Sequence, residues 1–243
     1  GYQIKTVLVD GQPVELDENN CYHFISISRA HNIIALFAKT TNEAYYNWTN
    51  SFTDISKNDW FYESVRYTAS AQLFIGTETT VFSPDDAMTR EMIVTVLWRL
   101  AGSPVVPDEN KISFRDVSTD SYAYEAIRWA SMFNIIEGYG DGTFGYGDPI
   151  LREQLVTILF RFARNYVGVD VSLADSTNIL GYSDVLQISQ GMAQPFQWAV
   201  GARIIYGTSR TTLEPRGMAT RAQVAAVFQR FSTNFMDKIP VFK

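Results

Sequence analysis

Three aspartates and three arginines recur along the chain at a nearly constant separation. The separation is 36 residues in the first two pairs and 37 in the third. The pairs are Asp54 and Arg90, Asp116 and Arg152, and Asp184 and Arg221. A guanidinium group binds a carboxylate through two parallel hydrogen bonds, and a carboxylate accepts hydroxyl groups. The pattern therefore indicates either three salt bridges within the protein or a ligand site built three times.

The residues around these pairs form a repeat of about 60 residues. The first blocks of the three copies are "FTDISKNDWFYESVRYTA", "FRDVSTDSYAYEAIRWA" and "YSDVLQISQGMAQPFQWAV". The second blocks are "VFSPDDAMTREMIVTVLWRL", "TFGYGDPILREQLVTILFRF" and "TLEPRGMATRAQVAAVFQRF". Each copy has the pattern of a helix, a loop and a second helix. We assign unit one to residues 51–103, unit two to 112–166 and unit three to 180–234, and we predict a mainly α fold.

Apolar residues recur with the helical period in both helices of each unit. The first helix has a face of small and apolar residues, namely Phe61, Ser64, Val65 and Thr68 in unit one and Ala123, Ala126, Ile127 and Ala130 in unit two. Because small residues allow close approach, we expect the first helices to pack together. The second helices carry Ile93, Val96, Leu97 and Leu100, then Leu155, Ile158, Leu159 and Phe162, then Val224, Val227, Phe228 and Phe231.

The three arginines fall in the first turn of the second helix, where the helix dipole disfavours a cation. One interpretation is a salt bridge from each arginine to a repeated aspartate. The other is a fork onto a ligand carboxylate, assisted by the amides at the helix start. Thr89 and Thr220 occupy the expected N-cap positions, with Gln223 completing a capping box. Leu151 cannot cap, so Asp148 caps from upstream or that helix start is weaker.

The stretch "GYGDGTF" in unit two raises the question of a phosphate or calcium site. No lysine follows as in a P-loop, and the oxygens of an EF-hand loop are not in place. Its first glycine aligns with one glycine in each other unit, giving the set Gly76, Gly138 and Gly207. These glycines follow the first helix, so we predict C-cap residues with positive φ.

The aspartates and aromatic residues of the repeat each have two interpretations. Asp54 and its counterparts accept sugar hydroxyls or cap the first helix. Trp60 and Tyr122 stack on a ligand or belong to the core, and unit three has Gly191 at the aligned position. If arginine and aromatic residue of one unit share a site, unit one alone has every element.

Composition narrows the function further. The 243 residues carry a net charge of −6 and are 46% hydrophobic, which indicates a folded protein and disfavours nucleic acid as a partner. No apolar run is long enough to insert into a membrane. The single cysteine, Cys21, excludes an internal disulfide, and His23 and His31 both lie before the repeats. We expect no enzyme, no metal and no cofactor, and the first residue, Gly1, suggests a piece of a longer protein.

Residues 1–39 differ from the repeats. "YQIKTVLVDGQPVEL" and "CYHFISISRAHNIIALFA" alternate β-branched and polar residues around a DG turn, which predicts strands. A polar and aromatic connector follows at residues 40–50.

The three units together resemble S-layer homology domains, through "F-x-D-V/I", "T-R-E/A" and "GYGDGTF" in register over residues 52–234. The resemblance implies a pseudo-threefold arrangement around a central three-helix bundle, with grooves between units. It also implies a secreted protein of the bacterial cell surface, anchored non-covalently to an anionic secondary cell wall polysaccharide that often carries pyruvate. The segment "SRAHNIIALFAKT" is similar to the ends of bacterial extracellular β repeats. A surface-layer assembly module that contacts other surface proteins is the alternative function.

Overall fold

The computed structural model describes residues 2–10, 12–17, 22–24, 31, 33–39, 43–235 and 238. The chain divides into two compact units, Gly1–Asn47 and Trp48–Lys243. Cys21 and much of the second expected β stretch lie outside the described residues. Within the described part, no helix has the length and apolar character needed to cross a membrane.

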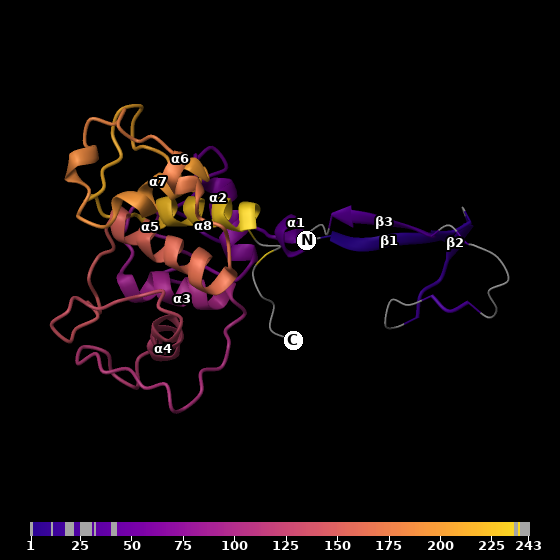
Figure 1. The fold of residues 1–243 in the computed structure, drawn as a ribbon, viewed down its shortest axis with the longest axis horizontal. Helices are drawn as coiled ribbons and strands as arrows, with labels where there is room; N and C mark the ends of the chain where they lie inside the picture. The colour runs from indigo at the N-terminus through magenta and orange to yellow at the C-terminus, as the bar shows by residue number, and fades with distance from the viewer. Residues whose placement is uncertain are drawn as a thin grey trace. The chain divides into compact units, whose positions relative to one another are not determined.

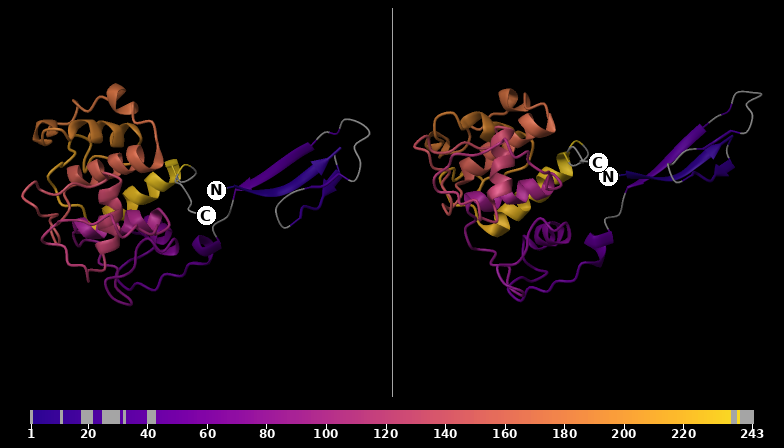
Figure 2. Two further views of the ribbon diagram at one scale, coloured as in Figure 1. Left: turned by 60° about the horizontal axis from the view of Figure 1, so that its bottom comes forward. Right: turned by 90° about the horizontal axis from the view of Figure 1, so that it is seen from below.

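The N-terminal unit contains a three-stranded antiparallel sheet in the order β2-β1-β3, drawn as an elongated ribbon in Figure 2. Its strands are β1 (Tyr2–Val9), β2 (Gln12–Val14) and β3 (Ile33–Lys39). Val9 pairs with Gln12, and Asp10, directly after β1, takes a left-handed φ of 53°. The short helix α1 (Glu43–Asn47) lies within the expected connector.

The second unit is helical and follows the predicted repeat (Figure 1). The first helices of the three units are α2 (Tyr62–Ser70), α4 (Tyr124–Met132) and α7 (Ala193–Gly201). The second helices are α3 (Arg90–Leu100), α5 (Arg152–Arg161) and α8 (Arg221–Phe235). A π-helix (Phe162–Val167), α6 (Leu173–Ser176) and a 3-10 turn (Val185–Gln187) occupy the longer path from α5 to α7.

The helical faces predicted from the sequence form the core. Every residue of the predicted apolar faces is buried except Leu100, which is half-buried at the end of α3. Burying a Val, Leu, Ile or Phe side chain contributes about 1.5–3 kcal/mol each. This burial explains why short helices, marginal by themselves, are stable here.

The first helices do not find their main packing partners in one another, as the small residues suggested. Each packs on the second helix of the preceding unit: α4 on α3, α7 on α5, and α2 on α8. On the small face of α4, Ala123, Ala126 and Ala130 are completely buried. The first helices thus pack on second helices, and not mainly on one another as expected.

The helix starts differ from the predicted caps. Thr89 Oγ1 is buried and has no hydrogen-bond partner among the residues that the structure describes. The Thr220 amide donates to Gln223 Oε1, and the Gln223 amide donates to Thr220 Oγ1, both at 3.4 Å. These two bonds form a capping box with long hydrogen bonds. Asp148 does not cap the helix that starts after Leu151, because it accepts the Tyr139 hydroxyl, while Gln154 Oε1 accepts the Leu151 amide at 3.0 Å.

Three backbone hydrogen bonds join the units in a closed ring just before the second helices. The Met88 amide donates to Ala219 O at 3.0 Å, the Ile150 amide to Met88 O at 2.8 Å, and the Ala219 amide to Ile150 O at 2.9 Å. Each bond links a different pair of units. The three units therefore close on themselves, and an open solenoid is excluded.

We expect the amides of Met88, Ile150 and Ala219 to exchange with solvent only through global unfolding, because opening any one of them separates two units. Hydrogen exchange measured by NMR checks this, with the exposed loop amide of Gly140, which donates to none of the described residues, as a fast-exchanging reference. Exchange of the ring amides much faster than that of the α4 core amides would contradict a ring that opens only on unfolding.

Candidate functional site: three grooves between the units

Three grooves lie at equivalent places where all three units meet. Each combines the first-turn arginine of one unit, the glycine and second helix of the next, and a residue from just before the first helix of the remaining unit. Groove A is lined by Arg221, Gly76, α3 and Tyr122; groove B by Arg90, Gly138, α5 and Met192; and groove C by Arg152, Gly207, α8 and Trp60. Their volumes are about 320, 140 and 380 Å3 in the same order.

The three arginines hold the neighbouring unit through backbone carbonyls. Arg90 donates from Nε to Phe144 O at 3.0 Å and from Nη2 to Glu137 O at 3.0 Å. Arg152 and Arg221 make the same pair of bonds to the next unit in turn, at 2.7–2.8 Å. Each arginine is only 5–6% exposed. The predicted salt bridges to the repeated aspartates are not formed, because those carboxylates are bound elsewhere.

Burial lowers the pKa of all three arginines, and nearby acidic groups partly counter it. An arginine nevertheless stays protonated in a protein. In each case Nη1 makes no hydrogen bond with any residue that the structure describes, although the side chain lines a groove. Each groove thus contains a positive charge with unused donors.

The three aspartates fix the loop before the second helix, and they neither cap the first helix nor lie among the groove residues. Asp116 accepts the amides of Phe144, Gly145 and Tyr146 at 2.8–2.9 Å. Asp54 accepts two amides from Phe82 and Ser83, and Asp184 two from Leu213 and Glu214. The N-cap residues Phe61, Ala123 and Met192 make no side-chain cap.

Aspartate and arginine act on the same residue from two sides. Phe144 gives its amide to Asp116 of its own unit and receives a hydrogen bond from Arg90 of the preceding unit on its carbonyl. Phe82 and Leu213 are held in the same way, and all three side chains are completely buried. The regular spacing in the sequence therefore reflects a clamp on a core residue.

The amides at the starts of the second helices are already used. Arg90 N donates to Asp148 O, Arg152 N to Gly217 O and Arg221 N to Asp86 O, at 2.9–3.0 Å. The expectation that these amides assist an anion is therefore wrong. The guanidinium groups, by contrast, keep donors that are free of the described residues.

The repeated glycines are required by close packing and not by a left-handed backbone. Gly76, Gly138 and Gly207 are absent from the positions with positive φ, and the helix ends use non-glycine residues such as Gln72 and Asn134 in that conformation. A Cβ on Gly138 would lie 2.7 Å from the Phe114 ring and closer still to Thr143 O. The C-cap prediction is corrected accordingly.

The exposed aromatic residues lie in grooves, but with the arginine of another unit. Trp60 is 65% exposed and lines groove C with Arg152, and Tyr122 is 59% exposed and lines groove A with Arg221. Groove B has Met192 at this place, next to the aligned Gly191. Partial burial, followed by the charges of Glu91 and Tyr146, raises the pKa of Tyr122 to about 12. Its hydroxyl therefore remains a donor at neutral pH.

A second set of repeated arginines was not identified from the sequence. Arg99, Arg161 and Arg230 each follow the first arginine of their helix by nine residues and line grooves A, B and C. The constant spacing in all three units was the available signal. Arg161 pairs with Glu137 at 2.8 Å, whereas Arg230 lies over the Tyr206 ring at 4.4 Å. Groove B is thus partly neutralised, while groove C keeps two cations.

Among the described residues no group of three or more His, Cys, Asp or Glu could hold a metal ion. His23 and His31 bond to Asp17 and Asp10, at 2.9 and 2.8 Å, in the N-terminal unit.

Comparison with known proteins places these features in a family. Residues 51–91, 113–156 and 181–225 each match the S-layer homology domain. The chain is 27% identical over 194 residues to an endoglucanase of Bacillus sp. (strain KSM-635), covering 80% of this chain and 20% of that protein. It is 25% identical over 157 residues to a cellulosome-anchoring protein of Acetivibrio thermocellus, covering 62% of this chain and 33% of that protein. The chain thus spans a third or less of these relatives.

We predict that Gly138→Ala lowers the free energy of unfolding by about 1–3 kcal/mol, because the added methyl overlaps backbone and ring atoms. Gly181→Ala is the matched control, since a Cβ there meets nothing within 4 Å, and it should change stability by less than about 0.5 kcal/mol. Urea denaturation measures both. Equal stability of the two variants would refute the close-packing explanation.

Asp116→Asn should destabilise the protein by about 1–3 kcal/mol at neutral pH, because an amide cannot accept three backbone hydrogen bonds equally well. Burial alone would raise the pKa of Asp116, but the amides of Phe144, Tyr146 and Gly145 lower it below its usual value. The native carboxylate therefore stabilises the fold fully above about pH 4, and this contribution is lost as the pH falls through the lowered pKa.

Unfolding free energies measured by urea denaturation from pH 7 to pH 2 test this, with the exposed Asp120→Asn as control. The difference between wild type and Asp116→Asn should shrink at the acidic end. A difference that stays constant with pH would show that the charge on Asp116 has no part in it.

Proposed function

Because the chain belongs to the S-layer homology domain family, we propose that it anchors a bacterial surface protein to the cell wall by binding a secondary cell wall polysaccharide in its grooves. S-layer homology domains are non-catalytic modules of cell-surface proteins. One relative is a cellulosome-anchoring protein and another is a cell surface glycoprotein, both of Acetivibrio thermocellus. In this proposal the chain is secreted and acts at the cell wall.

The proposal rests on one observation: each groove contains a guanidinium group whose Nη1 donates no hydrogen bond to any described residue. A buried cation that already holds two carbonyls is fixed in place, so it binds an anion with little loss of side-chain entropy. Each groove also has a second arginine and an exposed aromatic ring, which is Tyr122 in groove A, Tyr139 in groove B and Trp60 in groove C. An acidic sugar, pyruvylated or otherwise, matches these residues, because it has a carboxylate, hydroxyl groups and a ring face.

The net charge of −6 opposes long-range attraction of an anionic polymer. Binding must then depend on short-range pairing within the grooves. We expect affinity to weaken with rising salt, since the partners meet at a solvent-facing surface.

We further infer that the units are related by an approximate threefold rotation, with α3, α5 and α8 toward the axis. The closed ring of backbone bonds and the cyclic order of arginine contacts support this. Residues 1–39 would be the end of an extracellular β repeat, followed by a linker over 40–50 and the units 51–103, 112–166 and 180–234.

Cosedimentation with purified cell walls of a bacterium that carries an S-layer tests the function. The protein should pellet with native walls and remain in solution when the polysaccharide has been removed chemically. Retention on the stripped walls would instead favour the alternative, an assembly module that contacts other surface proteins.

The arginine variants should differ in a set order. Arg152→Ala should weaken wall binding most, by about 10- to 150-fold for a lost charged hydrogen-bond pair, because groove C has two cations and Trp60. Arg90→Ala should weaken it least, since groove B is small and contains the Arg161–Glu137 pair. If each groove took its arginine and aromatic residue from one unit, Arg90→Ala would instead weaken binding most, because unit one alone has every element.

Binding isotherms on native walls measure these differences, and circular dichroism checks that each variant is folded. Trp60→Ala removes an exposed groove residue without disturbing the clamp, and Arg216→Ala changes an exposed arginine outside the grooves. Undiminished binding by both Trp60→Ala and folded Arg152→Ala would refute groove C as a binding site.

A further inference from the structure

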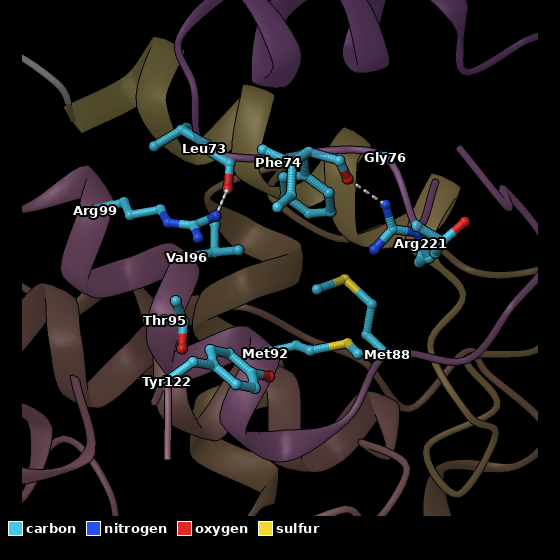
Figure 3. A pocket seen from close by; sticks show the side chains of 12 residues that line it. Leu73, Phe74, Gly76, Met88, Met92, Thr95, Val96, Arg99, Tyr122 and Arg221 are labelled. Atoms are coloured by element: carbon cyan, nitrogen blue, oxygen red, sulfur yellow. Dashed lines mark hydrogen bonds between the residues drawn. The ribbon is translucent and has the colours of Figure 1, made fainter. Parts of the chain in front are cut away.

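Groove A differs from grooves B and C because one polar side chain of the lining is replaced by an apolar one. At the third position of the second helix, groove A has Met92 where groove B has Gln154 and groove C has Gln223. Met88, Phe74 and Val96 continue the apolar surface beside Met92. Figure 3 shows these side chains in the middle of the groove, with Arg99 and Arg221 on opposite sides of it.

Helix stability does not account for the methionine. The two glutamines accept the amide of their own N-cap residue, at 3.0 Å in unit two and 3.4 Å in unit three. Methionine cannot do so, and Thr89 Oγ1 at the N-cap of the same helix is buried without a hydrogen-bond partner in the described part of the chain. Unit one therefore lacks a stabilising helix cap at the position where its groove has a methionine in place of glutamine.

The polar groups that remain in groove A define what kind of ligand fits. Arg221 donates from Nη2 to Ile75 O at 2.7 Å and Arg99 from Nη1 to Leu73 O at 3.1 Å, which fixes both cations at the groove wall. Tyr122 adds an exposed ring and a protonated hydroxyl. A ligand there meets positive charge at its ends and a flexible apolar surface in between.

We propose that groove A selects an acidic sugar that carries an alkyl or acyl substituent, whereas groove C binds acidic sugars through charge and hydroxyl groups without this preference. The carboxylate pairs with an arginine and the substituent packs on Met92 and Met88. This inference rests on the proposed function and adds a division of specificity among the grooves. Each methyl group buried on the ligand should strengthen binding about fourfold.

The test uses the whole chain with 13C-labelled methionine methyl groups, observed by NMR. Met88 and Met92 report on groove A, and Met192 reports on groove B. The probes are N-acetylmuramic acid, which has a carboxylate and two substituent methyl groups, glucuronic acid, which has a carboxylate and hydroxyl groups only, and neutral N-acetylglucosamine.

N-acetylmuramic acid should shift the Met88 and Met92 signals with a dissociation constant at least fourfold lower than that of glucuronic acid. Met92→Gln, followed through Met88, should abolish this difference while leaving stability unchanged or higher, because glutamine restores the helix cap. Met132→Gln replaces an exposed methionine of α4 outside the grooves and should leave the preference intact. Gln223→Met should create the preference in groove C, followed by calorimetry.

Equal affinity of the two acids at Met88 and Met92, or a preference that survives Met92→Gln, would overturn the proposal. Equally strong binding of N-acetylglucosamine would overturn its acidic part. These outcomes are distinct from failure of the proposed function, in which the protein does not pellet with native walls and neither acid shifts any groove signal.

Discussion

The constraint on which the helical unit depends is the burial of one arginine per unit at a boundary with the next. A buried guanidinium must have hydrogen-bond partners, because an unpaired buried charge is strongly destabilising. Here two carbonyls of the neighbouring unit satisfy it, as in Arg221 with Phe82 and Ile75. Each unit therefore completes the polar interactions of another, and the closed order of contacts leaves no unit with an unsatisfied end.

The grooves follow from the same constraint. The carbonyl before each repeated glycine accepts a hydrogen bond from an arginine. The chain there passes close to its own loop, so only a glycine fits. The carbonyls use only part of each guanidinium, and the remainder lines the hollow between units. Structural and binding roles thus belong to the same side chain. Variants at the first-turn arginines affect both, while those at Trp60, Met92 or Gln223 separate them.

The three grooves are built on one plan but have diverged in charge and polarity. A neighbouring carboxylate, Glu137, neutralises part of groove B, and Met92 makes groove A apolar. In groove C, Arg230 lies over the Tyr206 ring, and neither Arg152 nor Arg230 forms a salt bridge with a carboxylate of the described residues. Divergence is tolerated at these positions because the clamp that holds the fold uses other atoms.

The sequence by itself determined the repeat, the helices and their buried faces, because apolar residues at helical spacing must be covered whatever the partner. The family and the importance of Arg90, Asp116 and Gly138 also follow from it. Only the tertiary structure decided what these residues contact. The backbone carbonyl that an arginine contacts in another unit cannot be identified from the residue types, since every residue has a carbonyl. For the same reason, the placement of Trp60 with Arg152 depended on how three units close into a ring, a long-range relation that local spacing does not encode.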